Sequence, residues 1–131
     1  MNRAQIREAA IAATVDVGWL VVFVIGGRSS HRESASATEA LEVFAPFAIA
    51  LVVAWCLARA WRAPAAPFPT GASVLLITAG LGLLLRWAAF GRSTAFGFVI
   101  IGTFFLMITL LGWRMVAEWW RERRQASDNK P

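Results

Sequence analysis

A carboxylate inside an apolar segment is the residue of this sequence whose type and position most clearly suggest chemistry. Asp16 lies within "AAIAATVDVGWLVVFVIGG", residues 9–27. If this segment crosses a membrane, an unpaired carboxylate there is unfavourable by several kcal/mol, so Asp16 needs a partner or water. It could bind a proton, a cation or a polar ligand. Equally, it could be protonated or paired and hold one helix against another, and the sequence leaves both hypotheses open.

Arg86 is the cation that the sequence offers as a partner for Asp16. With each segment centred on the bilayer, Arg86 lies about 8 Å outside the midplane and Asp16 about 2 Å inside it, at the usual helical rise. The gap of roughly 10 Å is too long for an easy direct ion pair, although one water could close it. The simpler expectation is that Arg86 extends outward to the lipid head groups.

A second group of polar residues is expected at the outer mouth of the protein. His31 is the only histidine and could titrate near neutral pH. Glu39 and Glu42 are three positions apart and would share a helix face. With Arg28 and Arg92 these residues could bind a ligand or relay protons, or they could form a solvated loop with weak surface ion pairs. Their spacing matches no metal site, and we expect no metal or cofactor.

Four apolar segments position these residues. The chain has 131 residues, of which 58% are apolar, and a mean hydropathy of +0.58. A membrane-spanning helix needs about 20 apolar residues, and backbone groups in lipid must be satisfied within the segment. The sequence therefore predicts an all-α, polytopic membrane protein with a single domain of two helical hairpins. The predicted spans are residues 9–27, 41–60, 71–90 and 94–113, and a basic amphipathic cytoplasmic tail follows at 114–131.

The basic residues indicate orientation rather than nucleic-acid binding. Of the 13 Lys and Arg residues, nine flank the termini and the middle loop and four flank the two hairpin loops. This asymmetry places both termini in the cytoplasm, as expected for a bacterial inner-membrane protein. The net charge of +5 forms no continuous basic face of the kind that binds nucleic acid. The single cysteine, Cys56, excludes an intrachain disulfide.

The tetrapeptide after the first span nearly recurs after the third. "GRSS" occupies residues 27–30 and "GRST" residues 91–94, an offset of 64. Two parallel hairpins related by a pseudo-twofold axis along the membrane normal would explain this pattern. The alternative is coincidence, because Gly, Arg, Ser and Thr all suit a turn at the membrane surface.

An aspartate in the first span followed by "FVIGGRSSH", residues 23–31, resembles the signature of an uncharacterised family of small, four-span bacterial membrane proteins, catalogued as a domain of unknown function. The matching positions are Asp16, Gly27, Arg28 and His31. The resemblance implies a four-helix membrane fold and supplies no activity, substrate or cofactor.

Two classes of function remain open, and a third is less well supported. The first is a small transporter or channel-like protein for a small solute or ion. It would act as a homo-oligomer, with Asp16 and the threonines at 78, 103 and 109 lining a polar path. The alternative is a non-catalytic membrane subunit or a lipid-binding or assembly protein, whose partners are the bilayer and a larger complex. An enzyme at the outer head groups is the third, and the sequence contains no complete catalytic constellation.

Overall fold

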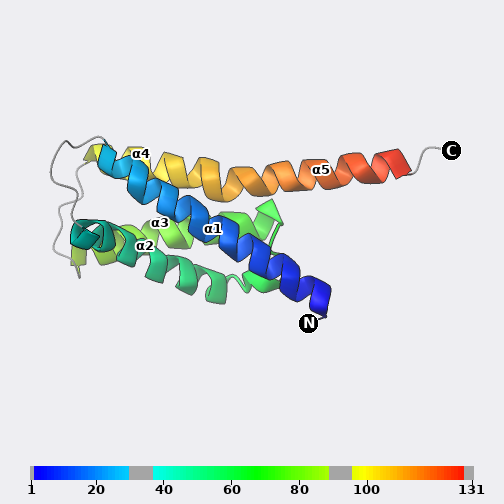
Figure 1. The fold of residues 1–131 in the computed structure, drawn as a ribbon, viewed down its shortest axis with the longest axis horizontal. Coiled ribbons are helices and arrows are strands. Elements are labelled where there is room, and N and C mark those ends of the chain that lie inside the picture. Colours follow the sequence, from blue (N-terminus) through cyan, green and yellow to red (C-terminus); the bar gives the residue numbers. More distant parts are fainter. Residues whose placement is uncertain (1, 30–36, 89–95, 129–131) are drawn as a thin grey trace.

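The computed structural model describes residues 2–29, 37–88 and 96–128, and these ranges are almost entirely helical, with no strand among them. The last long helix is interrupted only by a wide turn, η3, so that α4, η3 and α5 follow one another as a single rod (Figure 1). This confirms the prediction of an all-α chain with four helices long and apolar enough to cross a membrane. The helices are α1 Arg3–Ser29, α2 Ala37–Leu57, α3 Ala72–Ala88, α4 Phe96–Leu106, η3 Met107–Leu111 and α5 Gly112–Asp128.

The helices form a bundle in which α2 and α3 pack most closely. Ala50 and Ala54 on α2 are completely buried, because small side chains one turn apart let two helix backbones approach. The beginning of α1 and the end of α5 lie at the same end of the bundle (Figure 1). We call this the terminal end.

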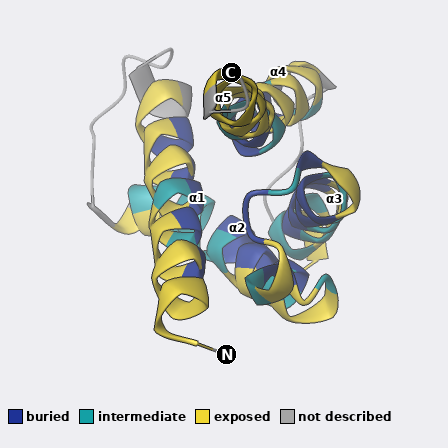
Figure 2. Cartoon of the chain, turned by 90° about the vertical axis from the view of Figure 1, so that its right-hand side faces the viewer, coloured by how far each residue is buried: buried dark blue, intermediate teal, exposed yellow. Residues whose placement is uncertain are grey.

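The buried residues face the interior of the bundle (Figure 2), and many large apolar side chains lie exposed on its outside. Ile25, Leu76 and Ile101 are 64%, 70% and 72% exposed. In water such a surface would drive aggregation, whereas in lipid it meets hydrocarbon. Only 28–39% of each candidate span is buried inside the chain, which is the pattern of an integral membrane protein.

The length of α2 sets the depth of the bundle in the membrane. Its 21 residues extend about 31 Å at 1.5 Å per residue, close to the thickness of a hydrocarbon core. If α2 crosses the hydrocarbon along its whole length, its last residue, Leu57, lies at one edge. α1 and α5 continue beyond this level at the terminal end (Figure 1).

The connection between α2 and α3, residues 58–71, folds back against the bundle instead of extending into solvent. Near its start, Arg59 adopts a positive φ of 48°, which turns the backbone away from the helical path of α2. A short turn, η1 Ala60–Arg62, contacts α1, and a wide turn, η2 Pro67–Gly71, contacts α5. Ala60, Thr70 and Gly71 are buried, so the connection closes the terminal end of the bundle.

Stacked aromatic rings fill the middle of the bundle. Phe23 on α1 meets Phe47 on α2 edge to face, with ring centroids 5.2 Å apart, and Phe105 on α4 at 5.7 Å. On the other side of Phe47 lies Gly82 of α3. A Cβ atom at this position would lie 2.7 Å from Cε1 of Phe47 and closer still to its Cδ1 atom, so the close approach of α2 and α3 requires glycine here.

We predict that Gly82→Ala lowers the thermal stability of the detergent-solubilised protein, by about 1–3 kcal/mol, because the added methyl group overpacks against Phe47. Gly80→Ala is the matched control on the same helix, since a Cβ atom there meets nothing within 4 Å. Thermal unfolding of both variants tests this, and equal stability of the two would contradict it.

Candidate functional site

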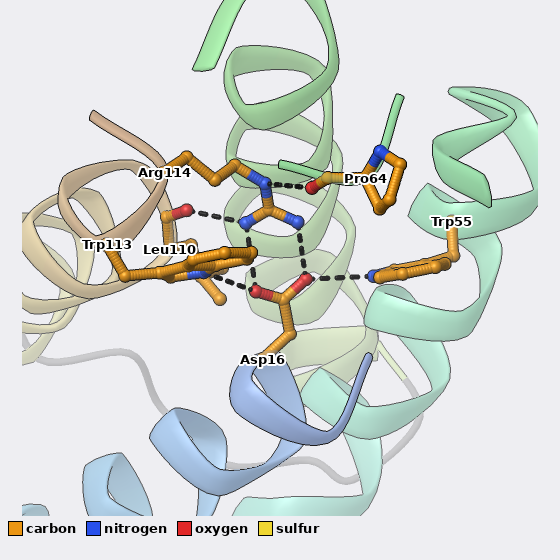
Figure 3. A network of polar contacts seen from close by, with 6 residues as sticks. All are labelled: Asp16, Trp55, Pro64, Leu110, Trp113 and Arg114. Atoms are coloured by element: carbon orange, nitrogen blue, oxygen red, sulfur yellow. Dashed lines mark hydrogen bonds and ion pairs between the residues drawn. The ribbon is translucent and has the colours of Figure 1, made fainter. Parts of the chain in front are cut away.

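The carboxylate of Asp16 forms an ion pair with Arg114 in the interior of the bundle, where both side chains are 0% exposed. The pair is bidentate: Nη1 donates to Oδ1 at 2.9 Å and Nη2 donates to Oδ2 at 2.7 Å (Figure 3). Parallel hydrogen bonds of this kind fix the orientation of both groups and are stronger than bonds between neutral partners.

Two tryptophans complete the shell of donors around the carboxylate. Nε1 of Trp55 donates to Oδ2, and Nε1 of Trp113 donates to Oδ1, both at 2.9 Å (Figure 3). Each carboxylate oxygen thus accepts two hydrogen bonds. We call these four residues, Asp16, Trp55, Trp113 and Arg114, the Asp16 cluster.

The guanidinium group of Arg114 is satisfied on its other edge by backbone oxygens. Its Nε donates to the carbonyl of Pro64 at 3.0 Å, and Nη1 donates to the carbonyl of Leu110 at 2.6 Å. The ring of Trp113 also lies 4.5 Å from Cζ of the guanidinium, within cation–π distance. Four of the five N–H groups of an arginine are therefore used, which leaves little capacity for a ligand.

Three helices, the connection and the turn η3 position these side chains. Asp16 lies midway along α1, Trp55 lies near the end of α2, and Pro64 belongs to the buried connection. The wide turn η3 directly precedes Trp113 and Arg114; because it holds more residues than an α-helical turn, it rotates the residues that follow it. Gly71 leaves room for the arginine, since a Cβ atom there would lie 2.7 Å from Cδ of Arg114.

The energetics of the cluster are those of a buried ion pair. Taking both charges out of water offsets much of their attraction, so the intact pair adds little net stability. Removing one partner is different, because it leaves a desolvated charge and typically lowers stability by about 3–5 kcal/mol. The cluster can thus hold α1, α2, the connection and α5 in one relative arrangement.

The structure separates Arg86 from Asp16. Arg86 lies in the last turn of α3, fifteen residues after Gly71, which corresponds to about 22 Å along the helix from the cluster. The cation that pairs with Asp16 is Arg114, at the terminal end, and not Arg86, the partner that the sequence suggests. Glu42 is half-buried on α2, far from the cluster in the same direction.

The remaining predicted site residues lie outside the described part of the chain. His31 and Arg92 fall in the ranges 30–36 and 89–95, and the side chains of Arg28 and Glu39 are not described although both residues belong to helices. Within the described residues, no three His, Cys, Asp or Glu side chains gather to bind a metal.

Sequence reasoning missed the three donors of the cluster. Arg114 had been counted with the basic tail, because it directly follows the fourth apolar segment. A charge balance could have narrowed the search: a carboxylate within the membrane requires a cation, and Arg59 and Arg114 are the arginines at the terminal end that lie within or directly beside a predicted span. Trp55 and Trp113 carry no comparable signal, since tryptophans near helix ends usually mark the membrane interface.

We predict that Asp16→Leu and Arg114→Met each lower the free energy of unfolding by about 3–5 kcal/mol, because each leaves the other charge buried. The double variant Asp16→Leu/Arg114→Met should lose less than either single variant. Unfolding by SDS titration measures all three, with Arg121→Met on the exposed part of α5 as the control. Losses that simply add in the double variant would disprove the coupling.

The indole N–H groups allow a separate prediction. Trp55→Phe and Trp113→Phe should each lower the free energy of unfolding by about 1.5–3 kcal/mol, because each removes a hydrogen bond to a charged group. Trp61→Phe makes the same chemical change at a half-buried indole outside the cluster and should have a smaller effect. If Trp61→Phe were as destabilising, ring packing rather than donation would explain the loss.

Comparisons with known proteins identify a family but no function. Searches of the curated proteins and of the solved structures give no match. A family model described as "Protein of unknown function (DUF3054)" matches residues 13–117. The match begins three residues before Asp16 and ends three residues after Arg114, so it includes the whole Asp16 cluster. In agreement with the resemblance noted in the sequence, this four-helix membrane protein belongs to the DUF3054 family of proteins of unknown function.

Proposed function

We propose that this protein is a non-catalytic membrane protein that binds anionic phospholipid at its terminal end, with the helical bundle as a closed anchor. The observation that carries the proposal is the Asp16 cluster. The carboxylate deep in the bundle is saturated by four donors from the protein itself. The exposed cations, by contrast, are available at the surface.

Two of the three threonines predicted to line a polar path, Thr103 and Thr109, give it little support. Thr103, predicted to line such a path, is exposed on the outer surface of the bundle. The hydroxyl of Thr109 donates to the carbonyl of Phe105 in its own helix at 2.8 Å. Transport, and the homo-oligomer that it requires, remain predictions from the sequence. They call for a second conformation in which the Asp16 cluster opens.

The terminal end is rich in exposed arginines from three separate segments. Because basic segments are retained on the cytoplasmic side, this end would face the anionic inner leaflet of a bacterial plasma membrane. Several arginines at the level of the head groups attract anionic lipid more strongly than any one of them would. They are Arg3 and Arg7 of α1, Arg59 and Arg62 of the connection, and Arg121, Arg123 and Arg124 of α5.

The part of α5 beyond Arg114 has the amphipathic character of a lipid-binding helix. Its apolar side chains, Val116, Trp119 and Trp120, are 57%, 47% and 56% exposed, and three arginines follow them between residues 121 and 124. The guanidinium of Arg123 lies 3.8 Å from the ring of Trp119. Exposed tryptophans and arginines side by side on one helix are the composition of a helix at a membrane interface, which suits both kinds of side chain.

Hydrogen exchange of the full-length protein in nanodiscs tests this proposal. Adding phosphatidylglycerol to phosphatidylcholine nanodiscs should slow amide exchange in residues 115–127 by about tenfold, because the anionic lipid holds α5 at the interface. Arg123→Gln/Arg124→Gln should remove the difference between the two lipids.

Arg3→Gln/Arg7→Gln is the matched control, since it removes the same charge from the same end of the bundle without touching α5. Equal exchange in both lipids would refute the proposal. Protection of α5 that depends on a copurified protein instead of on lipid charge would identify a protein partner and also refute it.

A further inference from the structure

An apolar groove of about 300 Å³ lies between α1 and α2 on the outer surface of the bundle. Val17 of α1 and Val52 of α2 form part of its walls and are 45% and 64% exposed. The other residues that line it are apolar or aromatic apart from the thiol of Cys56, and they include Trp61 of η1. At this depth, facing hydrocarbon, a groove of this composition can hold an acyl chain.

Trp55 connects this groove with the Asp16 cluster. Its ring lines the groove, while its Nε1 donates to Oδ2 of Asp16. An acyl chain in the groove would pack against the ring and keep it in the orientation that donates to the carboxylate. The occupancy of the groove and the stability of the cluster are therefore linked through one side chain.

Two arginines are close neighbours in the chain of Trp61, which lines the groove. Arg59 and Arg62 are both exposed, and the hydrogen bond from N of Arg62 to O of Arg59, 2.9 Å long, closes the turn between them. The two guanidinium groups thus start from neighbouring points of the backbone. They follow directly on the end of α2, at the edge of the hydrocarbon, where the phosphate of a phospholipid lies.

The same charges argue against a second copy of this chain as the occupant of the groove. In a twofold dimer with its axis along the membrane normal, the two grooves would face each other at the same depth. The Arg59 and Arg62 pairs of both copies would then lie close together and repel. An anionic lipid instead neutralises the two arginines and fills the apolar groove with the same molecule.

We infer that the α1–α2 groove is a binding site for one anionic phospholipid, whose acyl chain lies against Trp55 and whose phosphate is bound by Arg59 and Arg62. This deepens the lipid binding proposed above by naming a second, discrete site distinct from α5. Lipid bound there stabilises the Asp16 cluster, because it holds Trp55 in the donating position.

Cys56 provides a natural probe of the groove, because it is the only cysteine of the chain and is exposed. In detergent micelles, phosphatidylglycerol should slow alkylation of Cys56 by N-ethylmaleimide several-fold more than phosphatidylcholine does. Native mass spectrometry of the same samples should show one retained phosphatidylglycerol. Inorganic phosphate should have no effect, which separates a lipid from a free anion.

Two variants test the two halves of the site. Arg59→Gln/Arg62→Gln should abolish the preference for phosphatidylglycerol, and Val52→Trp, which fills the groove at an exposed position, should abolish protection by either lipid. For comparison, Cys56→Ala/Ile101→Cys moves the thiol to an exposed position on α4, where phosphatidylglycerol and phosphatidylcholine should act alike.

The variant Arg123→Gln/Arg124→Gln separates this inference from the proposal for α5. It should keep the protection of Cys56 even though α5 no longer responds to anionic lipid. Equal protection by the two lipids would overturn the groove site, as would an unchanged preference after Arg59→Gln/Arg62→Gln. Protection by phosphate alone would overturn it as well, since it would assign the turn to a soluble anion.

Discussion

The bidentate ion pair between Arg114 and Asp16 lies in the interior of the bundle, where both side chains are fully buried. The need to satisfy these two buried charges governs the arrangement of the rest of the structure. In lipid, helices gain little from hydrophobic association, because the hydrocarbon is as apolar as their side chains. Polar contacts between helices therefore do much to determine how the helices of the bundle are placed relative to one another. Here one carboxylate receives donors from α2 and α5, and the arginine that pairs with it also binds the carbonyl of Pro64. A single charge pair thus determines how three helices and a connecting segment meet.

The buried connection and the wide turn both follow from this arrangement. A guanidinium enclosed by protein needs acceptors on every edge, and helices have few free carbonyls to offer. The irregular backbone around Pro64 and the loosened turn before Arg114 supply them. Irregular backbone next to the hydrocarbon is tolerated where protein surrounds it, and here it also satisfies the donors of the arginine. Gly71 permits the approach that a larger residue would block.

Much of the architecture could be predicted from the sequence, because the length of an apolar run and the cost of an unsatisfied backbone leave a membrane segment few choices. The importance of Asp16 was visible for the same reason. Its partner, Arg114, could not be predicted, because an arginine directly after an apolar run looks the same in sequence whether its side chain extends to the lipid head groups or points into the bundle. Which of the two occurs depends on the wide turn η3 and on the way residues 58–71 fold back against the terminal end of the bundle. Both are tertiary features. The α1–α2 groove depends likewise on how far two helices diverge, which a single sequence does not record.

The separation of Asp16 and Arg114 along the chain has a consequence for biosynthesis. They are 98 positions apart, so a ribosome working at 5–20 residues per second makes the arginine roughly 5–20 s after the aspartate. During that interval the first helix contains an acidic group without its counterpart, and translation must pass residue 114 before the pair can form. A product truncated before the final helix would keep that group uncompensated in the bilayer. A chain that contains Arg114 is thus chemically distinguishable from shorter fragments that lack it, and membrane quality control could recognise the unpaired carboxylate by its chemistry alone.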